Sequence, residues 1–196
     1  MESVKNIVNF LFETGMLART PRAGFFFLGS GKQSVAEHTN RTVFIGYVLA
    51  MLDGKVDIFK VMKMCLFHDL AEARTSDLNY VHQKYAKTDE KKAIKDLTAP
   101  LPFGEDIKKI LEEYEIRESR ESLFAKDADN LEMILFLKEQ VDIGNARAKE
   151  WLTRAVLRLK TEIATMLAKK IMSTDSSEWW FVDKDGPWWV NRERKE

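Results

Sequence analysis

The sequence predicts an all-α fold, a single-domain helical bundle, and three observations support this prediction. Apolar residues recur at helical spacing through most of the 196 residues. Residues that cap helices stand at the starts of several of these segments. No segment alternates apolar and polar residues in the way that is typical of a β-strand. A chain of this length suits one domain with a sizeable core.

Several of the expected helices have a signal at their start or their end. Ser34 forms a capping box with Glu37, Asp57 is a good N-cap, and glycines at 54 and 144 end or interrupt helices. Residues 15–33 contain four glycines and one proline, which favours a long loop. The expected elements are helices at about 3–14, 34–53, 57–69, 88–97, 104–118, 120–141 and 146–172, with a loop at 15–33 and an irregular segment at 74–87.

The composition excludes several classes of protein. Lys plus Arg equals Asp plus Glu at 31 each, so the chain lacks the broad basic field that binds a nucleic acid polymer. The single cysteine, Cys65, cannot form an internal disulfide, and the N-terminus lacks the pattern of a signal peptide. No apolar run approaches the roughly 20 residues of a membrane span. We therefore expect a cytoplasmic protein without a membrane partner.

Two of the three histidines point to a metal site. His38 lies in the first turn of the second helix, and His68 is followed directly by Asp69 at the end of an apolar run. Neighbouring helical residues point about 100° apart, yet both can reach an ion beside the end of a helix. Imidazole nitrogen together with carboxylate oxygen suits borderline divalent metals. The alternative is a hydrogen-bonded structural histidine, so further ligands are needed to support a metal site.

The long helix at 120–141 offers a further carboxylate. Asp127 and Asp129 occur in an otherwise apolar run, and a carboxylate on a core-facing position is costly unless it is paired or binds a metal. Asp129 lies between Phe124 and Leu131, where the helix should partly face inward, and is the candidate ligand. The alternative is that one aspartate caps a helix or forms a salt bridge while the other is solvated.

Glu72 is a candidate for proton transfer. It follows His68 by four residues, so we expect both on one face of the same helix. A bound divalent ion lowers the pKa of water to about 7, and a nearby carboxylate can accept or donate the proton. The alternative is a surface ion pair between Glu72 and a Lys or Arg one turn away.

These residues together resemble the H…HD…D pattern of the HD-domain phosphohydrolase superfamily, and most closely its 5′-deoxynucleotidase branch. The resemblance covers about residues 3–170, and the motif set is specific only when taken together. The matching motifs are Arg19-Thr20-Pro21-Arg22-Ala23-Gly24, Ser34-Val35-Ala36-Glu37-His38, His68-Asp69-Leu70-Ala71-Glu72 followed by Asp77-Leu78, and Lys126-Asp127-Ala128-Asp129.

The resemblance implies a role for each matching residue. Glu72 would be the general acid/base, and Asp77 would contact the deoxyribose hydroxyl or help to arrange the attacking water. Arg22 would bind the 5′-phosphate, with Arg19 as a second candidate for that role. Phe25, which stands where the family often has Trp, is assigned to substrate binding. The metal ligands would be His38, His68, Asp69 and Asp129.

The resemblance also implies one divalent metal ion, which would be Co, Mn, Zn, Ni, Fe or Mg. A second metal would need extra histidines between Asp69 and Asp129, and only His82, expected in a loop, lies there. The substrate would be a (deoxy)nucleoside 5′-monophosphate, hydrolysed to nucleoside and phosphate. The family implies a homodimer.

Residues 1–172 would form the HD domain, and the Trp-rich tail at 173–196 would pack on the domain or on a dimer partner. Two alternatives remain at this point. One is an HD-fold nucleotide-binding or regulatory protein without turnover. The other is a structural helical protein whose aromatic tail binds a partner.

Overall fold

Helix α7 (Arg120–Asp142) is the central element of the computed structural model, which describes residues 2–192. The other elements are α1 (Glu2–Thr14), η1 (Gly15–Ala18), η2 (Ala23–Leu28), α2 (Val35–Asp53), α3 (Ile58–Phe67), α4 (Glu72–Thr75), η3 (His82–Lys84), α5 (Glu90–Thr98), α6 (Gly104–Ile116), α8 (Ala146–Val156), α9 (Glu162–Ser173) and α10 (Pro187–Asn191). Residues 2–192 contain no named strand, and the prediction of an all-α fold is confirmed.

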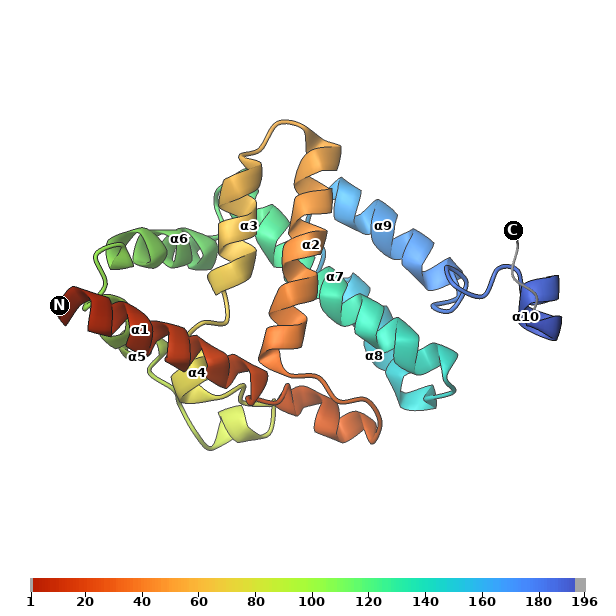
Figure 1. Ribbon diagram of the computed structural model, residues 1–196, viewed down its shortest axis with the longest axis horizontal. Coiled ribbons are helices and arrows are strands. Elements are labelled where there is room, and N and C mark those ends of the chain that lie inside the picture. Colours follow the sequence, from red (N-terminus) through yellow and green to blue (C-terminus); the bar gives the residue numbers. More distant parts are fainter. Residues whose placement is uncertain (1, 193–196) are drawn as a thin grey trace.

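The long helices surround α7 on several sides. It contacts α2, α3, α6, α8 and α9. In Figure 1 the hairpin formed by α2 and α3 stands in front of α7, with α5 and α6 on one side and α8 and α9 on the other. Phe124, Leu131 and Ile134 are at most 2% exposed, and burial of each such side chain contributes roughly 1.5–3 kcal/mol. Polar residues that α7 also buries therefore need partners.

The antiparallel α2–α3 hairpin determines where His38 and His68 lie. The helices approach so closely that a Cβ atom on Gly46 would lie 2.6 Å from the Sγ atom of Cys65. A larger residue than glycine would therefore force these helices apart at their crossing. Because the hairpin is antiparallel, the start of α2, with His38, lies beside the end of α3, with His68.

The predicted helix caps of α2 and α3 are confirmed. The Ser34 hydroxyl accepts a hydrogen bond from the Glu37 amide at 3.2 Å, and the Glu37 carboxylate accepts one from the Ser34 amide at 2.6 Å. The Asp57 carboxylate accepts from the Lys60 amide at 3.0 Å. Gly54 ends α2 in the left-handed conformation, with φ of 67°.

Three predicted boundaries were wrong. The helix expected at 146–172 is two helices, α8 and α9, because residues 157–160 unwind through i→i+3 bonds before Thr161 caps α9. The helix expected to continue to Asp69 ends at Phe67, and residues 68–71 form tight turns before α4 begins at Glu72. The expected long loop at 15–33 contains two short 3₁₀ helices.

Asp127 anchors the break between α8 and α9. Its fully buried carboxylate accepts hydrogen bonds from the Thr161 amide and hydroxyl, each at 2.7 Å, and from the Lys160 amide at 3.0 Å. Asp127 is thus the capping aspartate that the sequence left as an alternative, and its carboxylate is occupied by these contacts.

Asp127→Ala is expected to destabilise the fold. The change leaves three donors at the start of α9 without their acceptor, and an unsatisfied buried donor costs about 1–3 kcal/mol. Urea denaturation should therefore show a lower free energy of unfolding. Asp127→Asn, which keeps one carbonyl acceptor, should lose less. Equal stability of Asp127→Ala and the wild-type protein would contradict this role.

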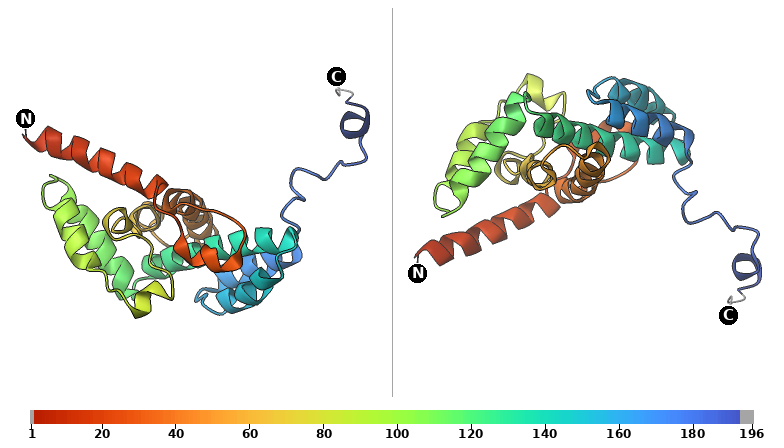
Figure 2. Two further views of the ribbon diagram at one scale, coloured as in Figure 1. Left: turned by 90° about the horizontal axis from the view of Figure 1, so that it is seen from below. Right: turned by 90° about the horizontal axis from the view of Figure 1, so that it is seen from above.

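The segment after α9 leaves the helical body, as both views of Figure 2 show. Its aromatic rings contact one another, with 4.9 Å between the ring centroids of Phe181 and Trp189 and 6.0 Å between those of Trp180 and Trp189. The Ser176 amide joins this segment to the domain through Asp142 at 2.8 Å. Residues 193–196 of the predicted tail lie outside the described residues.

Within residues 2–192, none of the helices has both the length and the apolar character of a membrane span.

Candidate metal centre and active site

The four predicted metal ligands come from three parts of the chain and meet beside α7. The Nε2 atoms of His38 and His68 are 3.1 Å apart, and the Oδ2 atom of Asp69 lies 3.6 Å and 3.2 Å from them. The Oδ1 atom of Asp129 lies 3.2 Å from Nε2 of His38 and 4.0 Å from that of His68. The structure therefore brings together the four side chains that the motifs selected.

Both imidazoles are oriented by a contact at Nδ1, the ring nitrogen that does not face the other predicted ligands. Nδ1 of His68 lies 2.8 Å from the Cys65 carbonyl, which can only accept, so this nitrogen carries the hydrogen. Nδ1 of His38 lies 2.6 Å from the Glu132 carboxylate. A neutral imidazole whose Nδ1 donates presents a lone pair at Nε2, which is the arrangement of metal-binding histidines.

The electrostatics of this cluster favour positive charge at its centre. Burial alone would raise the pKa of Asp69, but His68, His38 and Arg22 outweigh it and lower the pKa to about 2. Burial likewise opposes ionisation of Asp129, yet the histidines and Lys126 lower its pKa well below the ordinary value. Both carboxylates are therefore ionised at neutral pH.

His38 responds to the same charges in the opposite direction. Burial and the Arg22 guanidinium lower its pKa, but Asp129 and Glu132 prevail and raise the pKa to about 9. The surroundings of its Nε2 atom thus attract a positive charge. Two imidazole nitrogens and two ionised carboxylates fit one borderline divalent cation in ligand type and number. The donor atoms of His38, His68 and Asp69 lie within 4.8 Å of one another.

Behind His38, a buried carboxylate connects the centre to the surface. Glu132 on α7 is fully buried and accepts from Nε2 of Gln33 at 2.6 Å and from Nε of Arg41 at 2.9 Å, besides contacting His38. Arg41 in turn contacts Glu139 at 2.5 Å. Sequence reasoning missed Glu132. The available signal was its position three residues after Asp129 in the same apolar run.

Glu132→Gln is expected to weaken metal binding about 10- to 100-fold, the usual effect of losing the group that orients a histidine ligand. The neutral amide no longer holds the His38 ring with a charge-assisted hydrogen bond. Competition with a chelator measures the affinity. Glu139→Gln, which changes the exposed partner of Arg41, serves as the control and should bind metal normally. Equal affinities of wild-type and Glu132→Gln proteins would refute the role.

Glu72 and Asp77 lie together at a cavity of about 420 Å³ next to the metal centre. Burial, together with the nearby Asp69 and Asp77 carboxylates, raises the pKa of Glu72 to about 9, so it carries a proton at neutral pH. Its Oε2 atom is buried and has no hydrogen-bond partner among residues 2–192. Burial also raises the pKa of Asp77, although Arg22 opposes this shift. The pKa values of these two carboxyl groups are thus shifted upward, whereas those of Asp69 and Asp129 are shifted downward.

The three residues predicted to bind substrate line one cavity but differ in burial, and one of them contacts a predicted metal ligand. Nη1 of Arg22 lies 3.3 Å from Oδ2 of Asp69, so this arginine adjoins the metal centre. Phe25 is buried and stacks on Phe136 with 4.0 Å between ring centroids, and Arg22 lies 5.9 Å from its ring. Arg19 is exposed and lines a separate cavity of about 610 Å³ formed by the loop, which Arg22 and Phe25 also line. Arg22 alone of these is placed beside the ligands.

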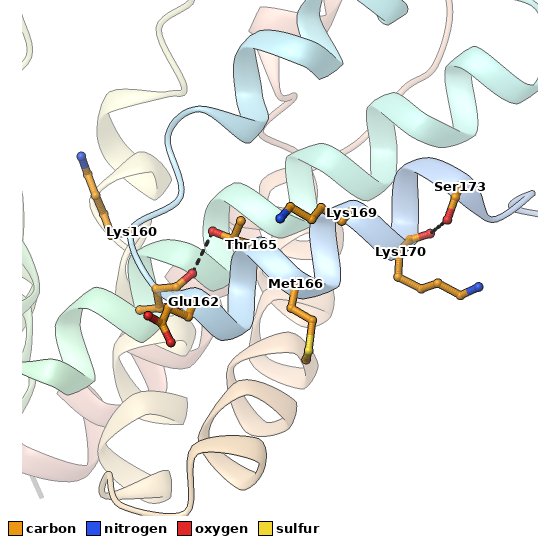
Figure 3. A pocket seen from close by; sticks show the side chains of 8 residues that line it. Lys160, Glu162, Thr165, Met166, Lys169, Lys170 and Ser173 are labelled. Carbon is orange, nitrogen blue, oxygen red and sulfur yellow. Dashed lines mark hydrogen bonds between the residues drawn. The ribbon is translucent and has the colours of Figure 1, made fainter.

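The third histidine and one further hollow lie away from this centre. His82 is exposed on η3. A hollow of about 600 Å³ lies along α9, and Figure 3 shows its lysines, Lys160, Lys169 and Lys170, pointing in different directions. Because these polar groups do not converge, the hollow does not present a built binding site.

Comparisons with known proteins agree with this geometry. The family model described as "HD domain" matches residues 14–172. A bovine protein named 5′-deoxynucleotidase HDDC2 is 34% identical over 149 residues, which cover 72% of this chain and 71% of that protein. A conserved hypothetical protein from Pyrococcus furiosus has a TM-score of 0.70 and 31% identity, covering 85% of this chain and 97% of that one.

A more distant structure shares the fold alone. It is the cyanophage S-2L HD phosphohydrolase (DatZ) bound to dA and one catalytic Zn²⁺ ion, with a TM-score of 0.51, 20% identity and coverage of 83% of this chain and 96% of that one. The resemblance inferred from the motifs is confirmed by the match that spans most of the chain. With its histidines and aspartates gathered beside α7, this chain belongs to the HD-domain family.

Proposed function

We propose that the protein is a metal-dependent 5′-deoxynucleotidase, which hydrolyses (deoxy)nucleoside 5′-monophosphates to nucleoside and phosphate. The observation that carries this proposal is the convergence of His38, His68, Asp69 and Asp129. The similarity to relatives that are named 5′-deoxynucleotidases supports the same substrate class.

The four converging side chains would hold one divalent cation. When bound, such a cation polarises a phosphoryl oxygen and makes water a better nucleophile at neutral pH. The exposed histidine of η3 is the only further one between Asp69 and Asp129, which favours one ion over two. Zinc is bound by the distant cyanophage protein, and we propose it with Mn, Co, Ni, Fe and Mg as ions to be tested.

The surrounding residues would bind the substrate and move the proton. Arg22 keeps its charge, because Asp69, Asp129 and Asp77 outweigh burial and raise its pKa, and it would bind the 5′-phosphate through its planar fork. When water attacks phosphorus and the bond to the 5′-oxygen breaks, Glu72 would give its proton to that leaving oxygen. Asp77 would contact the sugar hydroxyl or orient the water. Phe25, which lines the same cavity as Arg22, would contribute to substrate binding, and Arg19 remains a second candidate for the phosphate.

A panel of nucleoside monophosphates tests the function. Phosphate release should be measured from deoxyribose and ribose 5′-monophosphates with each divalent ion, and deoxynucleotides should be hydrolysed faster. A chelator should stop release, and adding back the ion should restore it. If the metal-loaded protein binds these nucleotides and leaves them intact, the chain is a binding or regulatory protein and the proposal fails.

We also propose that the protein acts as a homodimer in the cytoplasm, where its single buried thiol would stay reduced. The outward faces of α1, α2 and α3 expose a set of large apolar side chains, which are Val4, Val8, Leu11, Phe12, Phe44, Tyr47, Val48, Met51, Leu52, Phe59 and Leu66. In Figure 1 all three helices lie at the front of the molecule, where α2 packs against α3, and Figure 2 shows α1 extending away from this pair. Exposed apolar side chains of this size, several of them aromatic, are typical of protein–protein interfaces.

Analytical ultracentrifugation tests this dimer. Phe44 and Phe59 are 66% and 71% exposed, so Phe44→Asp and Phe59→Asp should leave the fold intact and convert the dimer to a monomer. Leu157→Asp, at a site 74% exposed on another surface, is the control and should stay dimeric. We further propose that the tail packs on the dimer partner. Removal of residues 175–196 should then weaken the dimer, and an unchanged dimer would refute this role of the tail.

A further inference from the structure

A lysine on α7 occupies the same position relative to Asp129 that Arg22 occupies relative to Asp69. Nζ of Lys126 lies 2.6 Å from Oδ2 of Asp129, the oxygen of this carboxylate that the histidines leave free. Nη1 of Arg22 lies 3.3 Å from Oδ2 of Asp69. The side chains of Lys126 and Arg22 are 28% and 15% exposed, so solvent reaches both cations. Each ligand carboxylate therefore has its own accessible cation.

An aromatic ring supports Lys126 at the edge of the centre. Its ammonium lies 5.7 Å from the centroid of the Tyr114 ring, and that ring lies 5.7 Å from the His68 ring. Tyr114 is itself buried, so it forms a fixed surface. The contact with a ring face attracts the ammonium and keeps it near the ligands. Lys126 thus differs from a lysine that extends freely from the outer side of α7.

Charge balance indicates why a second cation is needed. Ionised Asp69 and Asp129 contribute two negative charges, which a divalent cation would neutralise. A phosphate monoester adds nearly two more negative charges at neutral pH. Arg22 offsets one of them, and any ionisation of Asp77 increases the excess. Lys126 supplies the remaining positive charge within contact of the ligand set.

We infer that Lys126 is a substrate-binding residue whose ammonium donates a hydrogen bond to a phosphoryl oxygen from the Asp129 side, as Arg22 would from the Asp69 side. This inference rests on the proposed function, since it assumes a phosphate ester at the centre. A lysine suits this role as a flexible point charge. The alternative, a purely structural pair with Asp129 at i,i+3 spacing, would add little to stability.

Binding of inorganic phosphate to the metal-loaded protein tests Lys126 independently of turnover. Calorimetry on Lys126→Met should show phosphate binding weakened about 10- to 100-fold, as expected for loss of one charge-assisted hydrogen bond. The KM for nucleotide should rise in parallel, and Lys126→Arg should recover most of the affinity. Metal affinity, measured against a chelator, should change by less than about 10-fold, the lower limit for losing a group that orients a ligand.

Lys138→Met is the matched control, because Lys138 lies on the same helix and pairs with Asp142 at i,i+4 spacing, away from the centre. It should bind phosphate like the wild-type protein. If Lys126→Met keeps its phosphate affinity but loses metal, Lys126 merely holds Asp129 and the inference is overturned. If wild-type protein binds phosphate through Lys126 yet hydrolyses no nucleotide, the proposed function fails while the phosphate site stands.

Discussion

Asp69→Ala is expected to abolish phosphate release, lowering kcat/KM by at least about 10³-fold. A catalytic metal supplies several kcal/mol of charge stabilisation, and each 1.36 kcal/mol corresponds to a factor of ten in rate. Asp69 contacts His38, His68 and Arg22 at once, so its removal eliminates one predicted ligand and the contact that holds Arg22, the proposed phosphate-binding residue, at the centre. Elemental analysis of the purified variant should show little metal, and the phosphate assay should show little product.

Asp57→Ala is the matched control for this variant. Asp57 is an exposed aspartate that caps the other end of α3. Its loss should cost about 1 kcal/mol of stability, the usual effect of removing an N-cap, while metal content and activity stay near the wild-type values. Phosphate release by a metal-free Asp69→Ala protein would show that the proposed centre does not perform the reaction.

Glu72→Gln is expected to lower the activity of the protein while it raises the stability of the metal-free form. The amide cannot donate a proton to the leaving oxygen, so kcat should fall about 10²- to 10⁴-fold, the range that proton transfer contributes. In the wild-type protein kcat should also decline as the pH rises through the pKa of Glu72 near 9, because the ionised carboxyl has no proton to give. The pH profile of Glu72→Gln should lack this decline.

The same substitution should stabilise the metal-free protein. The unfolded chain releases the Glu72 proton near pH 4.5, whereas the folded protein holds it until about pH 9. Between these values the unfolded state binds fewer protons, so Glu72 makes stability fall as the pH rises. The Tm advantage of Glu72→Gln should therefore be small at pH 5 and larger at pH 8, with each 1 kcal/mol worth about 2–4 °C.

Glu90→Gln provides the control for both measurements, since Glu90 lines the same cavity but is exposed. Its kcat and Tm should stay close to those of the wild-type protein. An unchanged kcat in Glu72→Gln would mean that another group supplies the proton, and a Tm advantage that does not grow with pH would mean that Glu72 is not held protonated.

Local signals in the sequence predicted the helices well but not all of their ends. The capping box at Ser34 and the cap at Asp57 act through contacts within four residues, so they could be recognised without the fold. The break between α8 and α9 could not be recognised in this way, because it depends on Asp127, more than 30 residues earlier. The end of α3 at Phe67 was missed for lack of a glycine or proline signal.

The amino-acid sequence alone was enough to select the four predicted ligands, because the family motifs are recognised from residue types and spacing. Tertiary structure decided which other residues support them. Glu132 contacts His38 across 94 residues, and Lys126 stands over the ring of Tyr114, a residue of another helix. Phe25, predicted to bind substrate, lies in the core against Phe136. Helical periodicity specifies which face of a helix is buried, whereas the partner of that face depends on how helices cross.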